Sequence, residues 1–302
     1  MNPCRPAALR LQDKVCVVAP AGPIINSRNF KTALAFIEDR YRLEWRNELL
    51  TQKGFLAGDD KRRFHELQAA FDDPVISAVF AARGGWGTSR IIDQLNTAQL
   101  MDRPKWIIGS SDLTVLLVKL WIDCKMMSIH GPMPDGFSRT QASDRNALFS
   151  LLEGKPWHAP KELIPMVKGS AEGPLLGGNL TMLAHLAGCV PASFTDGAIL
   201  FLEDVTEMPY RVDRNLVQLK RSGILNNVAG IVLGNFTNCT PGADGLTVEQ
   251  VIQEQLLDLS VPVARNYPAA HGDRNYPFIH GCRMQLVVSN DFVKFEEAII
   301  SC

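Results

Sequence analysis

One segment combines a reactive side chain with the backbone geometry that can activate it. In residues 107–114 a short apolar run ends at Gly109, and Ser110, Ser111 and Asp112 lead into a second apolar run. A strand that turns into a helix in this way presents its serine at the helix N-terminus, where backbone N–H groups and the helix dipole stabilise a developing oxyanion. The turn has the form of a nucleophile elbow without its second glycine. The alternative is that Ser111 or Ser110 only caps the helix, a common role for serine.

A glycine-rich loop, residues 82–87 (ARGGWG), lies between a predicted strand and a predicted helix. Its glycines let the backbone approach a ligand closely and direct amides toward negative charge. Such a loop can form half of an oxyanion hole, bind a phosphate or be a plain tight turn, and the glycines alone do not choose among these. The lysine of a P-loop is absent.

Candidate acids and bases lie in the second half of the chain. Glu203 and Asp204 end an apolar strand, a frequent position for functional groups in α/β proteins, although a carboxylate there is also often only solvated. His271 lies in an irregular Pro/Gly segment that can present a side chain to a cleft, and histidine moves protons well near neutral pH. His130, before Gly131, is the chief rival as the base.

Composition narrows the class of partner. The 302 residues include 31 basic and 32 acidic side chains, so a net charge of -1 gives no reason to expect nucleic acid or an anionic membrane as partner. The seven cysteines form no CxxC pair and no zinc-type spacing, which indicates reduced thiols and no metal site. The first residues resemble neither an export signal nor a membrane span, so we expect a cytoplasmic protein that acts on a small ligand.

The order of elements predicts the fold class. In the first half, apolar runs typical of strands alternate with segments of helical periodicity, which favours a parallel sheet covered by helices. Strands are expected at 15–19, 75–81 and 106–108, and helices at 29–41, 61–71, 89–96 and 113–122.

The middle of the chain is expected to be a linker. Residues 136–172 are rich in Pro, Gly, Ser and charge around one short helix at 144–152, so we predict an N-terminal domain at 1–135 and a C-terminal domain at 173–302. The second domain is predicted to contain helices at 180–187, 212–222 and 248–257, strands at 198–202 and 230–234, and a strand-like tail from residue 282.

Together and in this order, these segments resemble the LD-carboxypeptidase family, which includes murein tetrapeptide carboxypeptidases and microcin C self-immunity peptidases. The resemblance implies a doubly wound N-terminal domain with a parallel sheet, a C-terminal α/β domain with barrel-like strands, and a homodimer. It is carried by residues 18–22, 57–59, 82–87, 109–114, 130–132, 176–180, 202–204, 210–219 and 271.

The resemblance also implies roles for individual residues. Ser111 is the expected nucleophile, Glu203 and His271 complete a triad, and the backbone amides of Gly85 and Asp112 form the oxyanion hole. The site is expected to lie between the domains and to need no metal or other cofactor. Candidate contacts to the substrate are Arg83, Trp86, His130 and Asn179.

The implied substrate is a cytoplasmic murein tetrapeptide, from which terminal D-alanine is released during peptidoglycan recycling. Trp86 stands where tyrosine is common in the family, and Ala270 where glycine is usual, so the shape of the substrate pocket is open. One alternative keeps the triad and cleaves a microcin-type aminoacyl or peptidyl adenylate. Another is a noncatalytic protein in which residues 83–87 bind an anion and Ser111 caps a helix.

Overall fold

The chain forms two compact units rather than one continuous body. The structure, a computed structural model, describes residues 2–269 and 271–298. Unit 1 runs as far as Pro156 and also includes Tyr276–Gly281, whereas unit 2 comprises Trp157–Asn275 and the described residues from Cys282 onward. The chain therefore changes unit three times. Within the expected linker, 136–172, the helix Ala142–Leu152 belongs to unit 1, whereas the strand Ile164–Val167 and the start of the strand Gly169–Asn179 belong to unit 2.

Unit 1 is built on a six-stranded sheet of order β11-β5-β4-β3-β1-β2. The strands from β5 to β2 pair in parallel, and β11 joins the edge antiparallel to β5. The central strands are almost wholly apolar and buried, as strands covered on both faces must be. The bounds are β1 Lys14–Val18, β2 Arg42–Glu44, β3 Ile76–Ala81, β4 Trp106–Gly109, β5 Ser128–His130 and β11 Phe278–His280.

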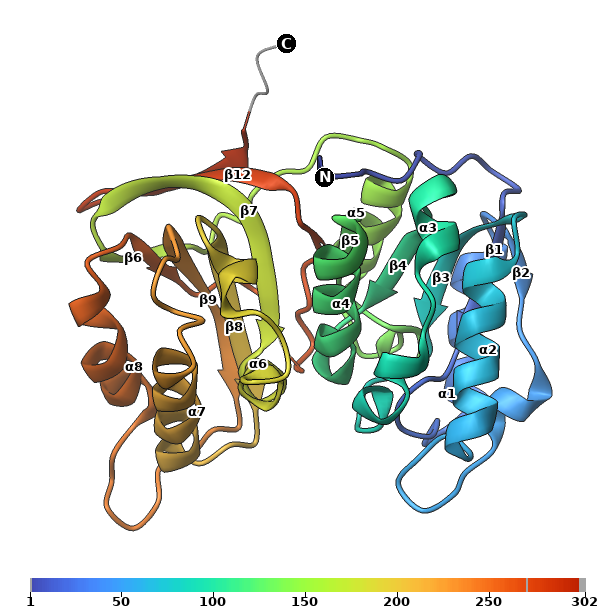
Figure 1. Cartoon of the computed structure of the whole chain (residues 1–302), viewed down its shortest axis with the longest axis horizontal. Helices are drawn as coiled ribbons and strands as arrows, with labels where there is room; N and C mark the ends of the chain where they lie inside the picture. Colours follow the sequence, from blue (N-terminus) through green and yellow to red (C-terminus); the bar gives the residue numbers. More distant parts are fainter. Residues whose placement is uncertain (1, 270, 299–302) are drawn as a thin grey trace. The chain divides into compact units, whose positions relative to one another are not determined.

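Helices cover both faces of this sheet (Figure 1). The helices α2 (Asp60–Asp72), α3 (Ala98–Asp102) and α4 (Thr114–Cys124) share one apolar core with the strands. On the other face lie α1 (Ser27–Glu38) and α5 (Ala142–Leu152), joined by edge-to-face contacts of their aromatic rings with Phe137. The doubly wound parallel sheet expected from the sequence is confirmed.

Unit 2 contains a seven-stranded sheet of order β13-β12-β7-β8-β9-β10-β6. The strands β7 to β10 are parallel, and β6, β12 and β13 pair antiparallel with their neighbours. Because β6 at one edge contacts β12 near the other, the sheet curls into a half-barrel, which confirms the barrel-like strands. The bounds are β6 Ile164–Val167, β7 Gly169–Asn179, β8 Ile199–Val205, β9 Gly230–Thr237, β10 Val263–Arg265, β12 Arg283–Val288 and β13 Val293–Glu297.

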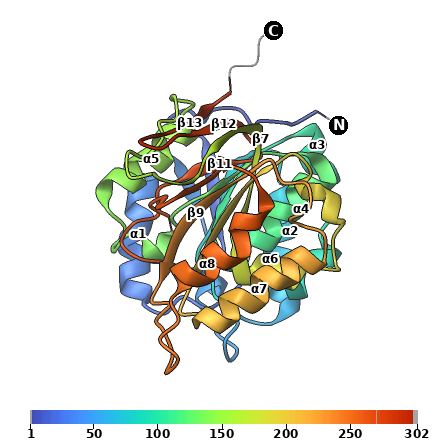
Figure 2. The same cartoon turned by 90° about the vertical axis from the view of Figure 1, so that its left-hand side faces the viewer.

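Three helices pack beside this half-barrel. Contacts join α6 (Leu180–Leu186) to α7 (Pro209–Arg221) and α7 to α8 (Val248–Leu256), and Figure 2 shows α7 and α8 in front of β9. Among the described residues, no helix has both the length and the apolar character that crossing a bilayer demands.

One expected helix, at 89–96, is wrong. The segment forms two separate 3-10 turns, Thr88–Arg90 and Ile92–Gln94, because Ile91 between them has φ -117° and ψ -9° and interrupts the helical path. The side chains of Ile91 and Ile92 are buried in the unit 1 core. Packing of these two neighbours into the same core overrides the local helical spacing.

Candidate active site

The predicted nucleophile lies on a strained turn at the end of β4. The strand ends at Gly109, a 3-10 turn spans Ser111–Leu113, and α4 begins at Thr114. Ser111 has φ 60°, in the left-handed region that residues other than glycine rarely occupy and that is often found at functional sites. Ser111 is half-buried, whereas Ser110 is buried, so the turn presents Ser111.

The alternative role of helix cap does not match this geometry. Ser110 is the residue that precedes the 3-10 turn, and its side chain makes no capping hydrogen bond there. Ser111 is already inside the turn, and Leu113 occupies the capping position of α4.

The glycine loop lies directly against the serine. A Cβ atom placed on Gly84 would be 2.8 Å from Ser111 Cβ and 3.0 Å from its Oγ, so only glycine leaves room for this contact. The Gly22 N–H donates to the Gly84 carbonyl over 2.9 Å and holds the loop from the other side. Gly85, the expected oxyanion donor, is exposed and has φ 101°. Asp112, the other expected donor, is the second residue of a helical turn, where amides lack an acceptor within the helix.

Two side chains that the sequence interpretation missed hold the end of the glycine loop. The Thr88 N–H donates to Oδ2 of the buried Asp112 carboxyl over 2.8 Å. Arg63, fully buried on α2, donates through Nη1 to the carbonyls of Gly87, over 2.7 Å, and Pro20. Burial raises the pKa of the Asp112 carboxyl. The hydrogen bonds from Thr88 and Gly87 and the charge of Arg63 act to lower this pKa, but burial outweighs them.

The position of Arg63 in the sequence contained a usable signal. The buried face of α2 consists of Arg63, Leu67, Ala70 and Phe71, which is the spacing of an apolar stripe. A guanidinium within such a stripe must find buried partners, because an unpaired buried charge is very costly. One partner, Asp60, lies one turn earlier on the same helix. The others are loop carbonyls 24 and 43 positions away, which the sequence alone did not reveal.

Three residues that the sequence analysis assigned to the site line one hollow in unit 1. Its volume is about 540 Å³, and Arg83, Gly85 and Trp86 contribute to its wall together with apolar residues such as Phe55. Arg83 donates through Nη1 to the Pro23 carbonyl over 2.6 Å, and its Nε lies 3.4 Å from Asp135 Oδ2. The guanidinium is therefore held at the wall of the hollow.

In unit 2, the predicted acid and base contact one another. Glu203 on β8 is only 1% exposed, and its Oε2 lies 3.0 Å from Nδ1 of His271, whose side chain is 27% exposed. Burial disfavours the charged imidazolium, but the charge and hydrogen bond of Glu203, with the charge of Asp204, outweigh it and raise the pKa of His271. A buried acid thus orients a more exposed imidazole.

Asp204, the neighbouring acid, has a different set of partners. Its carboxylate accepts from the N–H and Oγ1 of Thr181, over 3.0 and 2.8 Å, and from Nδ2 of Asn179, over 2.9 Å. Asn179 also caps α6 by accepting from the Met182 N–H. Asp204 and Asn179 therefore tie the start of α6 to the end of β8, and Glu203 is the carboxylate that pairs with His271.

His130 is placed in the core of unit 1. It is 1% exposed in β5, and its ring stacks on Phe278 with centroids 4.8 Å apart and an interplanar angle of 7°. This placement gives His130 a packing role, so we include it neither as the base nor as a substrate contact.

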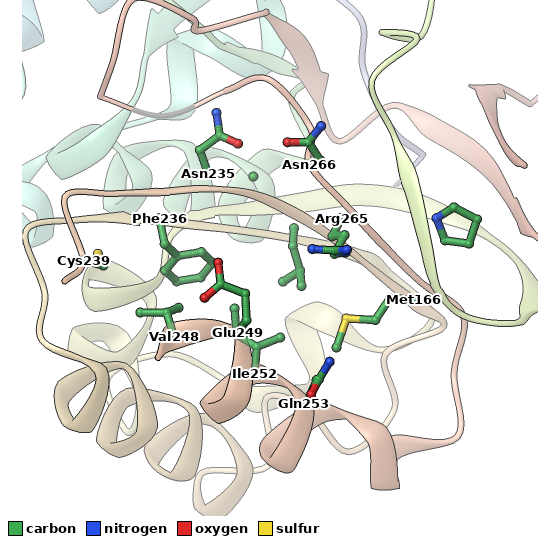
Figure 3. Close-up of a pocket in the computed structure, with 13 residues that line it drawn as sticks. Met166, Asn235, Phe236, Cys239, Val248, Glu249, Ile252, Gln253, Arg265 and Asn266 are labelled. Carbon is green, nitrogen blue, oxygen red and sulfur yellow. The ribbon is translucent and has the colours of Figure 1, made fainter. Parts of the chain in front are cut away.

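A further cavity of about 470 Å³ lies in unit 2, between β6, β9, β10 and α8 (Figure 3). Its wall includes Glu249 and Gln253 on α8 and Asn235 at the end of β9. No predicted site residue lines it, although a Cβ on its lining residue Gly234 would lie 2.9 Å from Glu203 Cβ.

Across residues 2–269 and 271–298, no group of three or more His, Cys, Asp or Glu side chains is placed to hold a metal ion. Ala270, noted for its difference from the usual glycine, lies outside the described residues.

Comparison with known proteins finds a match for each half of the chain. Residues 15–131 match the LD-carboxypeptidase N-terminal domain and residues 172–286 the LD-carboxypeptidase C-terminal domain. A probable murein peptide carboxypeptidase of Bacillus subtilis is 35% identical over 277 residues, which cover 88% of this chain and 86% of the relative. A murein tetrapeptide carboxypeptidase of Pseudomonas aeruginosa is 35% identical over 230 residues, 72% of this chain and 75% of the relative. The fold matches that of an MccF-like protein from Bacillus anthracis with a TM-score of 0.87 at 22% identity, over 97% of this chain and 99% of the other.

Proposed function

Because the chain belongs to the LD-carboxypeptidase family, we propose that it is a serine peptidase that releases terminal D-alanine from murein tetrapeptides. The observation that carries the serine chemistry is the strained Ser111 turn packed against Gly84 of the glycine loop. A half-buried serine on such a turn has the place of a nucleophile at the N-terminus of a helix.

In the proposed mechanism, His271 accepts the proton of the Ser111 hydroxyl as Oγ attacks the carbonyl carbon of the scissile amide. Glu203 holds the imidazole through Nδ1 and stabilises the imidazolium that forms. The buried position of Glu203 and its 3.0 Å contact with His271 favour this role. The protonated His271 then gives its proton to the departing amine of D-alanine.

The amides of Gly85 and Asp112 are proposed to stabilise the tetrahedral oxyanion. Both belong to segments that meet at Ser111, since Gly84 contacts the serine and Asp112 follows it. Donors fixed before the reaction need no reorganisation as the charge develops, which is why such sites accelerate acyl transfer. Water, activated by His271, would then hydrolyse the acyl-enzyme.

The path of the chain supports a shared role for Ser111 and His271. Tyr276, where the chain enters unit 1, lies only five positions after His271. Phe278 then pairs with His130, and His130 pairs with Gly109, the last residue of β4 before the nucleophile turn. The segment that carries His271 therefore continues into β11, an edge strand separated from β4 by β5 alone.

The substrate proposal rests on the names of the relatives and on the hollow beside Gly85. The terminal carboxylate of the peptide needs a donor, and the candidates are Arg83 and the amides of the glycine loop. A site built around one terminal D-residue should exclude a second, so pentapeptides ending in D-Ala-D-Ala are expected to be poor substrates. The family resemblance further predicts a cytoplasmic homodimer in peptidoglycan recycling, which sedimentation and cell fractionation would test.

The deciding experiment is mass spectrometry of muropeptides incubated with purified protein. We expect loss of D-alanine from L-Ala-γ-D-Glu-(diamino acid)-D-Ala tetrapeptides, no turnover by Ser111→Ala, and a much milder effect of Ser110→Ala. Equal residual activity in the two variants would remove Ser111 from the mechanism. If tetrapeptides stay intact while an aminoacyl-adenylate analogue is cleaved, the recycling role fails although the serine chemistry stands.

A further inference from the structure

The peptide bond between Gly87 and Thr88 is held from both of its polar sides. Arg63 Nη1 donates to its carbonyl oxygen over 2.7 Å, and its N–H donates to Asp112 Oδ2 over 2.8 Å. A peptide group is planar, so fixing the directions of its C=O and its N–H fixes the orientation of the whole plane. Gly87 itself has φ 136°, a conformation that residues with side chains rarely adopt.

The two clamping side chains come from two different elements. Asp112 is the residue after Ser111, and Arg63 projects from α2. Arg63 also donates to the Pro20 carbonyl, two residues before Gly22, whose N–H binds Gly84. Both ends of the glycine loop, Gly84 and Gly87, are therefore attached to the frame around Ser111.

A loop with three glycines in four residues has many accessible conformations unless its neighbours restrict it. For catalysis the restriction matters, because an oxyanion donor acts only within about 2.7–3.1 Å of the oxyanion. Between the clamped peptide and Gly84 lie only Gly85 and Trp86. The orientation of the Gly87–Thr88 peptide thus limits where the Gly85 amide can point.

We propose that Arg63 and Asp112 are positioning residues of the oxyanion hole, which clamp the Gly87–Thr88 peptide and thereby aim the Gly85 amide at the reacting carbonyl. This inference rests on the proposed serine mechanism. Arg63 touches no reacting atom in it. The Asp112 side chain has a task separate from that of the Asp112 backbone amide.

The test compares Arg63→Met, Asp112→Ala and Asp112→Asn with the unmodified enzyme. We expect Arg63→Met and Asp112→Ala to lower kcat about 10- to 100-fold, as displacement of a catalytic donor by about 1 Å does. KM should change little, because binding of the ground state does not depend on the oxyanion hole. Asp112→Asn should recover most of the lost kcat, since its amide oxygen still accepts from Thr88.

Two further measurements separate positioning from general damage. The rate at which a fluorophosphonate labels Ser111 should fall in parallel with kcat, because the labelled product also places an oxygen in the oxyanion hole. The acid limb of the pH–rate profile should not move, because the base is untouched. Arg145→Met is the matched control: Arg145 also donates to two carbonyls of unit 1, those of Phe137 and Thr140, and is not part of the proposed site. It should lower the melting temperature without lowering kcat.

The outcomes distinguish this inference from the proposed function. Normal kcat and labelling in folded Arg63→Met and Asp112→Ala, with an active parent enzyme, would overturn the clamp. Loss of kcat to the same degree in Arg145→Met would also overturn the clamp. An inactive parent enzyme would instead refute the proposed function. If Arg63→Met and Asp112→Ala do not fold, Asp112→Asn and Arg63→Lys decide the question. A partial loss of kcat in Arg63→Lys, which keeps one donor group, supports the clamp. Full activity in Arg63→Lys argues against it.

Discussion

At the scale of single residues, the space around Ser111 is set by the absence of one side chain. A Cβ atom on Gly84 would lie 2.8 Å from Ser111 Cβ. Two carbon atoms do not come this close unless one of them shifts. Gly84 is buried, and its carbonyl is held by Gly22, so the loop has little freedom to retreat. The serine, on a strained turn, is the group that must move.

Gly84→Ala is therefore expected to reduce kcat by about 100-fold or more, since displacement of a reacting atom by about 1 Å has a cost of this size. Gly136→Ala is the matched control, because a Cβ there meets nothing closer than Thr140 Oγ1 at 3.8 Å. Steady-state kinetics on tetrapeptide, with circular dichroism to confirm folding, measures both. Equal kcat for the two variants would show that the contact with Gly84 does not position Ser111.

The His271 and Glu203 pair predicts a particular pH dependence. Glu203 and Asp204 raise the pKa of His271 above its ordinary value of about 6.5, although burial acts against them. The base must be neutral to accept a proton, so kcat/KM should rise with pH through this raised pKa and then level off.

Glu203→Gln removes the charge that favours the imidazolium. The acid limb of the kcat/KM profile should then move to lower pH, while kcat falls by about 10⁴-fold, as for other triad acids. Asp204→Asn should shift the limb less, because Asp204 makes no hydrogen bond to His271 and is bonded to Thr181 and Asn179. An acid limb that stays in place in Glu203→Gln would exclude Glu203 as the partner of the base.

At the scale of elements, the sequence predicted those features whose causes are local. The β4 strand, its turn and α4 follow from an apolar run, a glycine and a second apolar run, all within 20 residues. For the same reason, the strand predicted at 198–202, with Glu203 and Asp204 at its end, is observed as β8, Ile199–Val205, which includes both acids. The choice of Glu203 over Asp204 needed the family resemblance, because the partners of Asp204 come from the end of β7 and the start of α6.

Elements that depend on distant neighbours were not predicted. β11 has three residues between Pro277 and Gly281, and only pairing with β5, about 150 positions earlier, makes it a strand. Arg63 has a visible signal in the α2 stripe, but its task depends on the carbonyls of two loops. Residues 89–96 have helical spacing, and the tertiary core prevents the helix.

The cap of α6 gives a prediction at this scale. Asn179 is 4% exposed, caps α6 and bonds Asp204, so Asn179→Ala loses a cap and leaves a buried carboxylate with one donor fewer. We expect a loss of about 1–2 kcal/mol in the free energy of unfolding. Asn26→Ala is the control, since exposed Asn26 caps α1 through one hydrogen bond and should cost less. Urea unfolding of the two variants measures the difference, and an equal or smaller loss in Asn179→Ala would deny the link between α6 and β8.

At the scale of the whole molecule, the most consequential feature is the return of Tyr276–Gly281 to unit 1. A bridge between Ala269 and Asn275 closes the loop that contains His271 within unit 2. The chain crosses to unit 1 immediately afterwards and pairs with β5. His271 therefore lies only five positions before the segment that joins the unit 1 sheet. In the proposed mechanism, this short connection keeps the effective concentration of His271 near Ser111 high.

This connection can be lengthened without altering either unit. Insertion of Gly-Ser-Gly-Ser between Asn275 and Tyr276 adds up to about 13 Å of chain and leaves both the Ala269–Asn275 bridge and β11 intact. We expect kcat to fall about 10- to 100-fold, because the base is then less closely confined to its productive position. The pKa of His271 should not change, since Glu203 lies in the same unit as His271. The same insertion in the exposed loop 241–245 of unit 2 should leave kcat unaffected. Undiminished kcat after insertion at 275/276 would mean that other contacts, and not the short connection, bring the base to the serine.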